Sequence, residues 1–374
     1  MLPYGRQSIS PEDIEAVAAI LRGDWLTTGP TVTAFEEAIA TATGGHRAVS
    51  CTSGTAALHM AYAAAGVGPG DQVVTTPMTF VATASGASIL GAEIVFADVE
   101  EDTALLDPAA VDAVVTERTK VIAAVDYAGH AADYDALQPI ADRVGALTVD
   151  DAAHSVGGTY KGRPVGDLAD ITTLSFFPTK NLTTGEGGAV VAKDDAIAQR
   201  AHEFHFIGLV RDPARFRIGD EGPWHQEVHD FGINYRLTDV ASALGLAQLA
   251  RLQRFKERRA EITARYNAAL ADVDGVRTPV QRAWVDPAWH LYPVRILDGR
   301  RREVFEKMRA AGIGVQVNYI PVYWHPVYAD LGYQRGMCPN AEAFYAEELS
   351  LPLFPDLTDD QVDQVVETLV SVLG

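Results

Sequence analysis

Short apolar runs alternate with helix-like segments through the first half of the chain. The runs are rich in β-branched residues and have the length of buried strands. They lie at residues 48–51, 73–77, 94–99, 121–126, 146–149 and 171–174. Strands that alternate with helices at this spacing predict a largely parallel sheet covered by helices on both faces, which is an α/β fold.

Both ends of the chain carry clear helix signals. Ser10 is placed to cap a helix whose first residue is Pro11, and Gly23 is placed to end it. Near the C-terminus, Thr358 and Gln361 have the spacing of a capping box. We therefore expect a helix before the first strand and another at the end of the chain.

Residues 206–234 interrupt the pattern. They mix Gly, Arg, Asp, Pro, His and Trp without a clear period, and a loop of this length is usually functional or disordered. A long helix is predicted after residue 239. The many Arg and Lys residues within 248–259 indicate a solvated helical face.

The last third of the chain predicts a smaller α+β unit, with strands near residues 291–296 and 313–319. A chain of 374 residues is too long for one simple core and suits a large domain with a smaller one attached. We place the large domain at residues 1–250. The small C-terminal domain, led by a long connecting helix, covers residues 251–374.

Composition narrows the class of protein. A hydrophobic content of 48% with 21% charged residues is ordinary for a globular enzyme. The net charge of −20 opposes binding to nucleic acid, and no apolar run approaches the roughly 20 residues of a membrane span. The only cysteines, Cys51 and Cys338, have no pairing or metal-ligand spacing, so we expect a cytoplasmic protein without a metal site.

Polar groups with catalytic potential follow two of the predicted strands. One strand runs into the Asp-Asp-Ala-Ala-His stretch of residues 150–154, and the other into the Ser-Phe-Phe-Pro-Thr-Lys stretch of residues 175–180. Ligands of open α/β sheets sit beyond the carboxyl ends of the strands, so these groups can face one crevice. A lone lysine after a strand is usually solvated, and adjacent aspartates usually cap a helix. Together, however, a lysine and an aspartate on neighbouring strand ends match what pyridoxal phosphate (PLP) chemistry requires.

The turn at residues 52–55 is a candidate phosphate site. Its small residues lead into a helix, whose first backbone N–H groups and dipole attract an anion. It is not a Walker A loop, because the Gly-Lys-Ser/Thr ending is missing. A Rossmann dehydrogenase is disfavoured as well, since no Gly-x-Gly-x-x-Gly follows the first strand.

These stretches, with Thr-Gly-Glu-Gly-Gly at residues 184–188, resemble the signature of the DegT-type (DegT/DnrJ/StrS) nucleotide-sugar aminotransferases. The resemblance covers nearly the whole chain. It implies the aspartate-aminotransferase-like PLP fold (fold type I), PLP as cofactor with pyridoxamine phosphate as its aminated form, and a homodimer with the site at the subunit interface. A PLP-dependent sugar dehydratase of this fold is disfavoured because such enzymes carry His where Lys180 stands. A non-catalytic regulator is disfavoured because both Lys180 and Asp151 are present.

The resemblance also assigns residues. Lys180 and Asp151 are the expected catalytic pair: Lys180 holds the cofactor and moves a proton, and Asp151 pairs with the pyridine nitrogen. We choose Asp151 over Asp150 because the family motif aligns there, and strand alternation points only one of them into the site. The remaining expected cofactor contacts are Phe80 on the ring, His154 on the phenolic oxygen or ring face, Gly54, Thr55 and Ser175 on the phosphate, and Asn234 on the phosphate in the partner subunit.

The substrates implied by the resemblance are an amino acid donor, usually glutamate, and a nucleotide-linked keto-6-deoxy sugar. Residues 24–30, 289–293 and 318–322 resemble in particular the branch that acts in pseudaminic acid synthesis, which favours C4 of a UDP-4-keto-6-deoxy-N-acetylhexosamine. A dTDP- or GDP-linked 3- or 4-keto sugar is the alternative. Candidates for the sugar-nucleotide or donor-carboxylate site are Arg6, Trp25, Arg236 and Tyr319.

Overall fold

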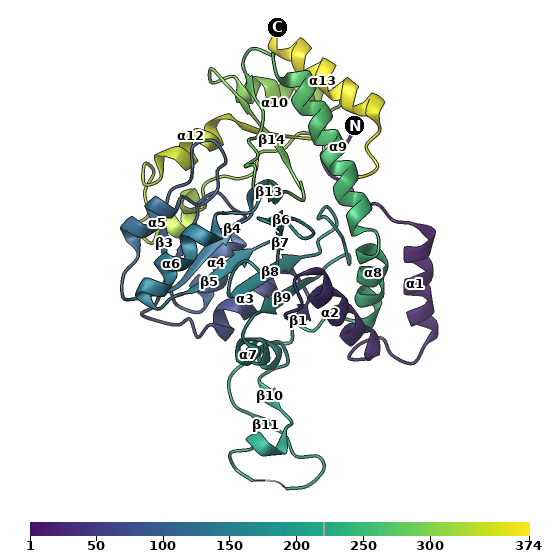
Figure 1. Cartoon of the computed structure of the whole chain (residues 1–374), viewed down its shortest axis with the longest axis vertical. Helices are drawn as coiled ribbons and strands as arrows, with labels where there is room; N and C mark the ends of the chain where they lie inside the picture. The colour runs from purple at the N-terminus through teal and green to yellow at the C-terminus, as the bar shows by residue number, and fades with distance from the viewer. Residues whose placement is uncertain (220) are drawn as a thin grey trace.

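The computed structural model describes residues 1–219 and 221–374. A large body holds the central sheet, a smaller unit sits on it at the C-terminal end, and a narrow arm projects from the opposite end (Figure 1). Among the described residues, no helix is long and apolar enough to cross a membrane.

The central sheet has seven strands in the order β1-β9-β8-β5-β4-β2-β3. Only β9 runs antiparallel to its neighbours, so the predicted mostly parallel sheet is confirmed. Its strands are short and mostly buried, as expected for a sheet covered on both faces. Their bounds are β1 Arg47–Cys51, β2 Gln72–Thr75, β3 Glu93–Phe96, β4 Thr119–Val125, β5 Leu147–Asp151, β8 Ile171–Ser175 and β9 Gly188–Ala192.

Helices cover both faces of this sheet and bury two separate apolar clusters. The helices on one face are α3 Gly54–Ala64, α4 Ala82–Ile89 and α7 Asp195–His205, and those on the other are α2 Pro30–Ala42, α5 Pro108–Val114 and α6 Tyr134–Val144. The alternation of apolar strands and helices in the sequence thus predicted the architecture of the large body.

The predicted N-terminal helix is α1, Pro11–Arg22, and it packs on α8, Asp239–Leu249. Ser10 caps α1 through a full capping box, and Gly23 follows its last residue. The second predicted capping box, of Thr358 with Gln361, starts α13, Asp359–Leu373. Both helix predictions are confirmed, because caps depend only on local sequence.

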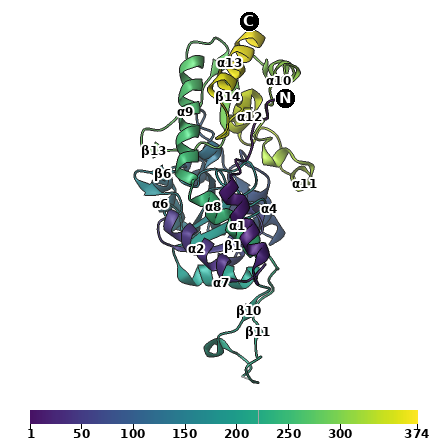
Figure 2. The same ribbon diagram turned by 90° about the vertical axis from the view of Figure 1, so that its right-hand side faces the viewer.

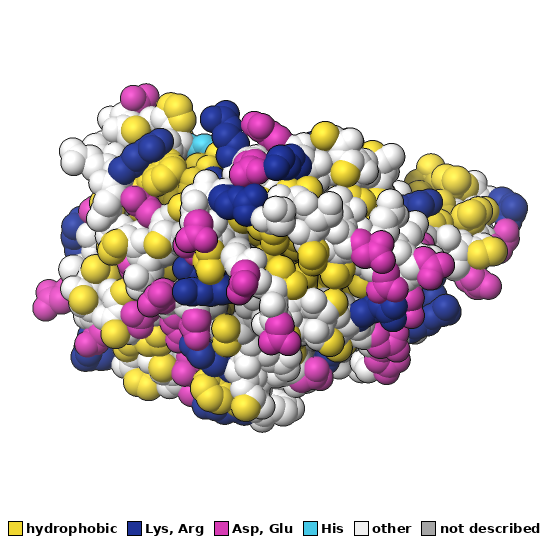
Figure 3. Space-filling model, turned by 90° about the horizontal axis from the view of Figure 1, so that it is seen from above, with side chains coloured by type: hydrophobic (Ala, Val, Ile, Leu, Met, Phe, Trp, Pro, Cys, Tyr) yellow, Lys and Arg dark blue, Asp and Glu magenta, His cyan; other side chains and the backbone are white. Residues whose placement is uncertain are grey.

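The smaller unit is built on α9, Leu252–Leu270, and on a three-stranded sheet in the order β12-β14-β15. Its other elements are β12 Val276–Arg277, β14 Tyr292–Ile296, β15 Glu348–Leu351, α10 Arg301–Ala310, α11 Pro326–Ala329 and α12 Pro339–Glu347. Seen from above, acidic and basic side chains intermingle over this part of the surface (Figure 3). Ion pairs such as Arg265–Asp363 and Arg300–Glu303 lie within it.

Some short elements join the two parts. β13 Val285–Asp286 pairs with β6 Thr159–Tyr160, which pairs in turn with β7 Arg163–Pro164. The N-terminal segment also crosses to the smaller unit, because Leu2 bridges to Ile313 and the N–H of Leu353 donates to the carbonyl of Tyr4. The remaining short helices are η1 Tyr127–Gly129, η2 Pro213–Arg215 and η3 Val322–Trp324.

The predicted strand at residues 313–319 is wrong. This segment makes only isolated bridges, at Ile313 and Gln316. Beyond these bridges, side chains hold its backbone: Asn318 donates its N–H to the buried carboxyl of Glu348, and its carbonyl accepts from the hydroxyl of Tyr127. The segment is apolar because it is packed between the two parts of the molecule, and apolar spacing alone does not distinguish that environment from a sheet.

The predicted solvated face at residues 248–259 is only partly right. Gln253, Arg254 and Glu257 are exposed, but Gln248, Lys256 and Arg259 are buried. Arg259 donates to the carbonyl oxygens of His290, Leu353 and Thr179 at 3.3, 3.0 and 3.4 Å. Cationic side chains usually remain in water, but α9 lies between the two parts of the molecule, where carbonyl groups accept from both terminal nitrogens of the guanidinium, while its Nε is buried without a partner.

Residues 206–219 and 221–234 form the arm, which extends away from the body around the small hairpin of β10 Leu209–Val210 and β11 Glu227–Val228 (Figures 1 and 2). Ile218, Trp224 and Phe231 are 85%, 76% and 98% exposed. Several large apolar side chains exposed on one projecting element are typical of a surface that another protein covers.

Candidate active site

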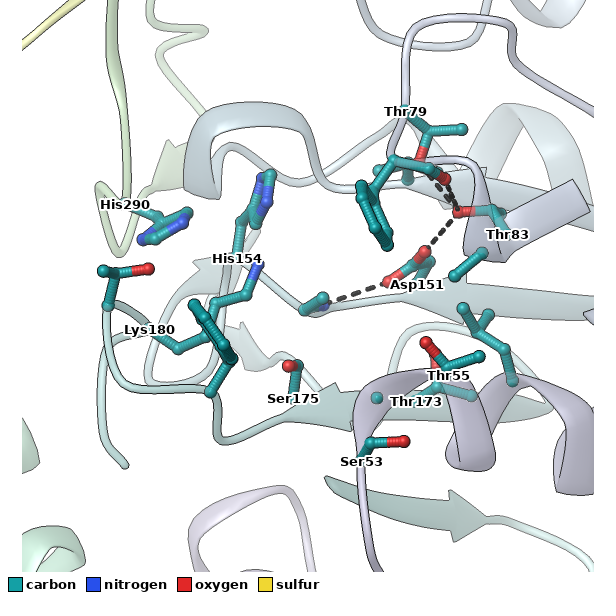
Figure 4. A pocket seen from close by; sticks show the side chains of 18 of the residues that line it. Ser53, Thr55, Thr79, Thr83, Asp151, His154, Thr173, Ser175, Lys180 and His290 are labelled. Carbon is teal, nitrogen blue, oxygen red and sulfur yellow. Dashed lines mark hydrogen bonds between the residues drawn. The ribbon is translucent and has the colours of Figure 1, made fainter. Parts of the chain in front are cut away.

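A cavity of about 690 Å³ opens at the carboxyl ends of β5 and β8, where segment 316–319 of the smaller unit closes one side. Its volume is in the range of small-molecule sites. Figure 4 shows Asp151 and Lys180 pointing into it from neighbouring strand ends. Of the residues singled out in the sequence, Gly54, Thr55, Phe80, Asp151, His154, Ser175, Lys180 and Tyr319 line this cavity.

Asp151 is the last residue of β5, and its carboxylate is buried. One carboxylate oxygen accepts a hydrogen bond from the Thr83 hydroxyl at 2.6 Å, and the other accepts from the N–H of Ala153 at 3.2 Å. Burial raises the pKa of Asp151, while Thr83 and the charge of Lys180 oppose that rise. Asp150 is fully buried, is not among the lining residues, and lies where strand alternation puts it, away from the cavity.

Lys180 follows β8 in a tight loop in which its N–H donates to the carbonyl of Phe177 at 2.9 Å. Burial lowers the pKa of its amine to about 8, although the Asp151 carboxylate acts in the opposite direction. An amine with this pKa is partly neutral near physiological pH, as a nucleophile or a general base requires.

The start of α3 forms a cradle at the floor of the cavity. Ser53 caps the helix by accepting from the N–H of Ala56 at 3.1 Å. A Cβ atom on Gly54 would lie only 2.8 Å from the Cβ of Ser175, so the two backbones approach too closely for a side chain there. This leaves the first N–H groups of α3 and the hydroxyls of Thr55 and Ser175 beside the cavity, an arrangement that fits a phosphate.

His154 is held between two other rings. Its Nε2 pairs with the hydroxyl of Tyr319 at 3.1 Å, and its ring centroid lies 4.5 Å from that of His290. Burial and the charge of Lys180 keep the pKa of His154 well below its usual range, so the ring is neutral. Phe80 is 59% exposed at the cavity mouth and makes an edge-to-face contact with Tyr319 at 6.2 Å between centroids.

Thr83 and His290 belong to this cavity but were not predicted from the sequence. Thr83 is the second residue of α4, and a threonine in a helix carries no specific signal. His290 is part of the Trp-His-Leu-Tyr-Pro stretch, which in the sequence indicates only a resemblance to one branch of the family. Both are brought to the cavity by packing between segments distant in sequence.

Four predicted site residues lie elsewhere. Arg6 lies in a surface hollow near the start of α13. Trp25 and Arg236 line a second cavity of about 630 Å³ beside α2 and α7. Asn234 is exposed and bridges to Phe206. Among the described residues that line the first cavity, Lys180 is the only lysine or arginine.

Comparison with known proteins agrees with this geometry. The model of the DegT/DnrJ/EryC1/StrS aminotransferase family matches residues 7–370. The spore coat polysaccharide biosynthesis protein SpsC of Bacillus subtilis is 39% identical over 378 residues, which span 100% of this chain and 97% of that protein.

Solved structures match over the same length. A Streptococcus pneumoniae protein in its PMP form is 31% identical, with a TM-score of 0.94 over 100% of this chain and 99% of that chain, and it has also been solved in a PLP form. Helicobacter pylori PseC, described as an aminotransferase involved in the biosynthesis of pseudoaminic acid, is 29% identical, with a TM-score of 0.92 over 99% of this chain and 98% of that chain.

Proposed function

The chain belongs to the DegT/DnrJ/EryC1/StrS family of PLP-dependent sugar aminotransferases, and from this premise we propose that it transfers an amino group from glutamate to C4 of a UDP-linked 4-keto-6-deoxy-N-acetylhexosamine. The product would be UDP-4-amino-4,6-dideoxy-N-acetyl-β-L-altrosamine, so the protein would act in pseudaminic acid synthesis. The observation that carries the proposal is the convergence of Lys180 and Asp151 on one cavity.

The residues of the cavity fit PLP. The N-terminus of α3 with Thr55 and Ser175 would hold the phosphate, and Asp151 would hold the ring nitrogen. When bound, PLP supplies an electron-accepting ring and carries the amino group between the two substrates. A buried carboxylate that already accepts two hydrogen bonds is suited to keep that nitrogen protonated.

Lys180 would hold the cofactor and, once released, carry the proton that moves during amino transfer. Its lowered pKa makes the neutral amine available for that step. His154 is fixed by Tyr319 and His290 and is neutral, so it would contact the cofactor without adding a second positive charge beside Lys180. Phe80, exposed at the mouth of the cavity, would cover the ring and exclude water.

The assignment of the sugar rests on three stretches of sequence. Residues 24–30, 289–293 and 318–322 resemble the pseudaminic acid branch, and the similarity to PseC supports that choice. A dTDP- or GDP-linked 3- or 4-keto sugar is the second candidate. In either case Arg6, Trp25, Arg236 and Tyr319 are proposed for contacts to the sugar nucleotide or to the donor carboxylate.

We propose that the working unit is a homodimer in which Asn234 reaches the cofactor phosphate of the partner. The exposure of Asn234, and of Phe231 three residues earlier, supports this placement, because both lie on the projecting arm rather than at the cavity of their own chain. The two free, buried cysteines, Cys51 and Cys338, support a reducing, cytoplasmic setting.

One experiment tests the proposed reaction. The holoenzyme is incubated with glutamate and a panel of UDP-, dTDP- and GDP-linked 3- and 4-keto sugars, and the position and stereochemistry of the new amine are read by NMR. Amination at C4 of the UDP-linked N-acetyl sugar is the expected result. Preference for a dTDP or GDP sugar would select the second candidate, and loss of a hydroxyl without gain of nitrogen would indicate a dehydratase.

A further inference from the structure

A buried carboxyl behind the wall of the catalytic cavity has no part in the proposed chemistry. Glu348 is the first residue of β15 and is 0% exposed. It is not among the residues that line the cavity, whereas Asn318 and Tyr319, in the segment that closes one side, do line it. Burying an acid is costly unless its oxygens find donors, so the contacts of Glu348 show what it holds in place.

Both oxygens of the Glu348 carboxyl accept a hydrogen bond. Oε2 accepts from the backbone N–H of Asn318 at 2.6 Å, and Oε1 accepts from the hydroxyl of Ser350, also at 2.6 Å. The Nδ2 of Asn318 donates to the same Ser350 oxygen at 3.0 Å. Glu348, Ser350 and Asn318 therefore bond to one another in a closed ring, which we call the Glu348 network.

Among the described residues, no lysine or arginine forms an ion pair with Glu348. Arg301 donates to the main-chain carbonyl oxygens of Tyr345 and Glu348 instead. Arg295 lies opposite Glu348 on β14, but its guanidinium pairs with Glu347. Burial raises the pKa of Glu348 to about 8, although the charge of Arg301 opposes the rise. This favours the uncharged carboxyl near neutral pH, so the reach of the side chain matters more than its charge.

The segment that the Glu348 network holds is the wall of the cavity, residues 316–319. At one end of the wall, Gln316 and Ser350 exchange backbone hydrogen bonds at 3.2 and 2.8 Å. Further along, the backbone of Asn318 is held by side chains: its N–H by Glu348, and its carbonyl by the hydroxyl of Tyr127 at 2.5 Å. The position of the wall at Asn318 thus depends on two side chains buried behind it.

The next residue of the wall carries this position into the cavity. The hydroxyl of Tyr319 pairs with Nε2 of His154 at 3.1 Å, and the two rings are stacked with centroids 6.1 Å apart. Active-site groups need support from surrounding hydrogen bonds, because a displacement of about 1 Å can cost about a hundredfold in rate. A shift of the backbone at Asn318 would draw the Tyr319 hydroxyl away from His154.

We propose that Glu348 is a positioning residue for amino transfer: it fixes the backbone of Asn318 and thereby holds the Tyr319 hydroxyl against His154 beside the cofactor. The role requires the full length of the Glu348 side chain, because its outer oxygen is the acceptor for Asn318. Glu348 itself touches neither cofactor nor substrate. This inference rests on the proposed function, in which His154 contacts the cofactor.

Binding of PLP to the apoprotein tests the inference without donor or sugar. The dissociation constant is measured near neutral pH from the yellow absorbance of the bound cofactor. Glu348→Asp keeps the acid but withdraws it by one methylene, and we expect it to bind PLP about tenfold more weakly. Glu348→Gln keeps the reach without the charge and should stay within about twofold of the native protein. Glu347→Asp is the matched control, since Glu347 is the preceding residue and pairs with Arg295; it should bind PLP as the native protein does.

A double-mutant cycle with Tyr319→Phe separates positioning from a general loss of structure. Phe has no hydroxyl for His154, so in Tyr319→Phe the further change Glu348→Asp should weaken PLP binding by less than about twofold. Ser350→Ala is the milder variant should Glu348→Asp fail to fold, because it removes the hydroxyl that joins Glu348 to Asn318. It should lose about threefold in affinity, and this loss should also vanish in Tyr319→Phe.

Three results would overturn the inference. Native affinity of both Glu348→Asp and Ser350→Ala would show that the wall does not depend on the Glu348 network. Equal losses in Glu348→Asp and Glu348→Gln would make charge, not reach, the requirement. The same loss with and without Tyr319→Phe would reduce Glu348 to a structural residue. If the cycle shows coupling but the native protein aminates no keto sugar, the proposed substrate fails and the positioning role stands.

Discussion

The hydroxyl of Thr83 donates a hydrogen bond to the carboxylate of Asp151 at 2.6 Å, although the two residues are 68 positions apart. Asp151 must be ionised to pair with a protonated ring nitrogen, and burial works against ionisation. The hydrogen bond from Thr83 is the largest effect that opposes it. The reactivity of the cavity therefore depends on a residue of α4 as well as on the strand ends.

Replacing Thr83 by Val should shift the acid side of the pH–rate profile. Without the donated hydrogen bond the pKa of Asp151 rises further, so the carboxylate is lost at a higher pH as the solution is acidified. The measurement is kcat/KM for amino transfer against pH. An acid limb at the same pH in both proteins would show that Thr83 does not tune Asp151.

Asp151→Asn should slow amino transfer by about a hundredfold or more, because a neutral amide cannot stabilise the positive charge of a protonated ring nitrogen. Asp150→Asn is the matched control. Burial and the charge of Asp126 raise the pKa of Asp150 well above its usual range, which favours the neutral carboxyl that an amide resembles in charge. Steady-state rates measure amino transfer by both variants, and circular dichroism checks that both are folded. Equal rates for the two variants would reject the role of Asp151.

Lys180→Ala should abolish both amino transfer and the yellow absorbance of cofactor bound through lysine. In the native apoprotein, the rate of colour development on adding PLP should rise as the pH passes through about 8, since only the neutral amine attacks. In Asp151→Asn the midpoint should move to lower pH, because the Asp151 charge raises the pKa of Lys180. Colour development in Lys180→Ala would place the attachment elsewhere.

Arg259→Met should lower the free energy of unfolding by about 3 kcal/mol, because it leaves buried carbonyl groups of both parts of the molecule without a donor. Urea unfolding followed by tryptophan fluorescence measures the change. Arg302→Met, on an exposed face of α10, should change it by less than about 0.5 kcal/mol. Similar values for the two variants would show that the burial of Arg259 is not a stability requirement.

Phe231→Asp should convert the proposed dimer to monomer and reduce activity in proportion to the fraction of monomer. The Phe231 side chain is 98% exposed in one chain, and leaving it in water is costly unless a second copy covers it. If a second copy does cover it, a carboxylate in the same place would be costly to bury. Light scattering across a concentration series measures the effect. Val370→Asp, 41% exposed on α13 at the opposite end, is the control; a Phe231 variant that remains dimeric would exclude the arm from the interface.

The local sequence determined much of this protein. Buried strands, helix caps and the small-residue turn before α3 depend on neighbours within a few positions, so their patterns could be read directly. Lys180 and Asp151 could be predicted because Asp151 ends one strand and Lys180 follows its neighbour, and the carboxyl ends of neighbouring parallel strands meet at one edge of a sheet. Strand alternation likewise separated Asp151 from Asp150.

Only the tertiary structure decided the rest. Thr83, His290 and Arg259 act through contacts between segments far apart in the chain, and an apolar or charged spacing does not record which carbonyl or ring a side chain will meet. For the same reason, residues 248–259 appeared solvated in the sequence but are partly buried in the structure. Arg211 and Arg236 likewise meet over the ring of Phe206 from different segments, and no local pattern carries that convergence.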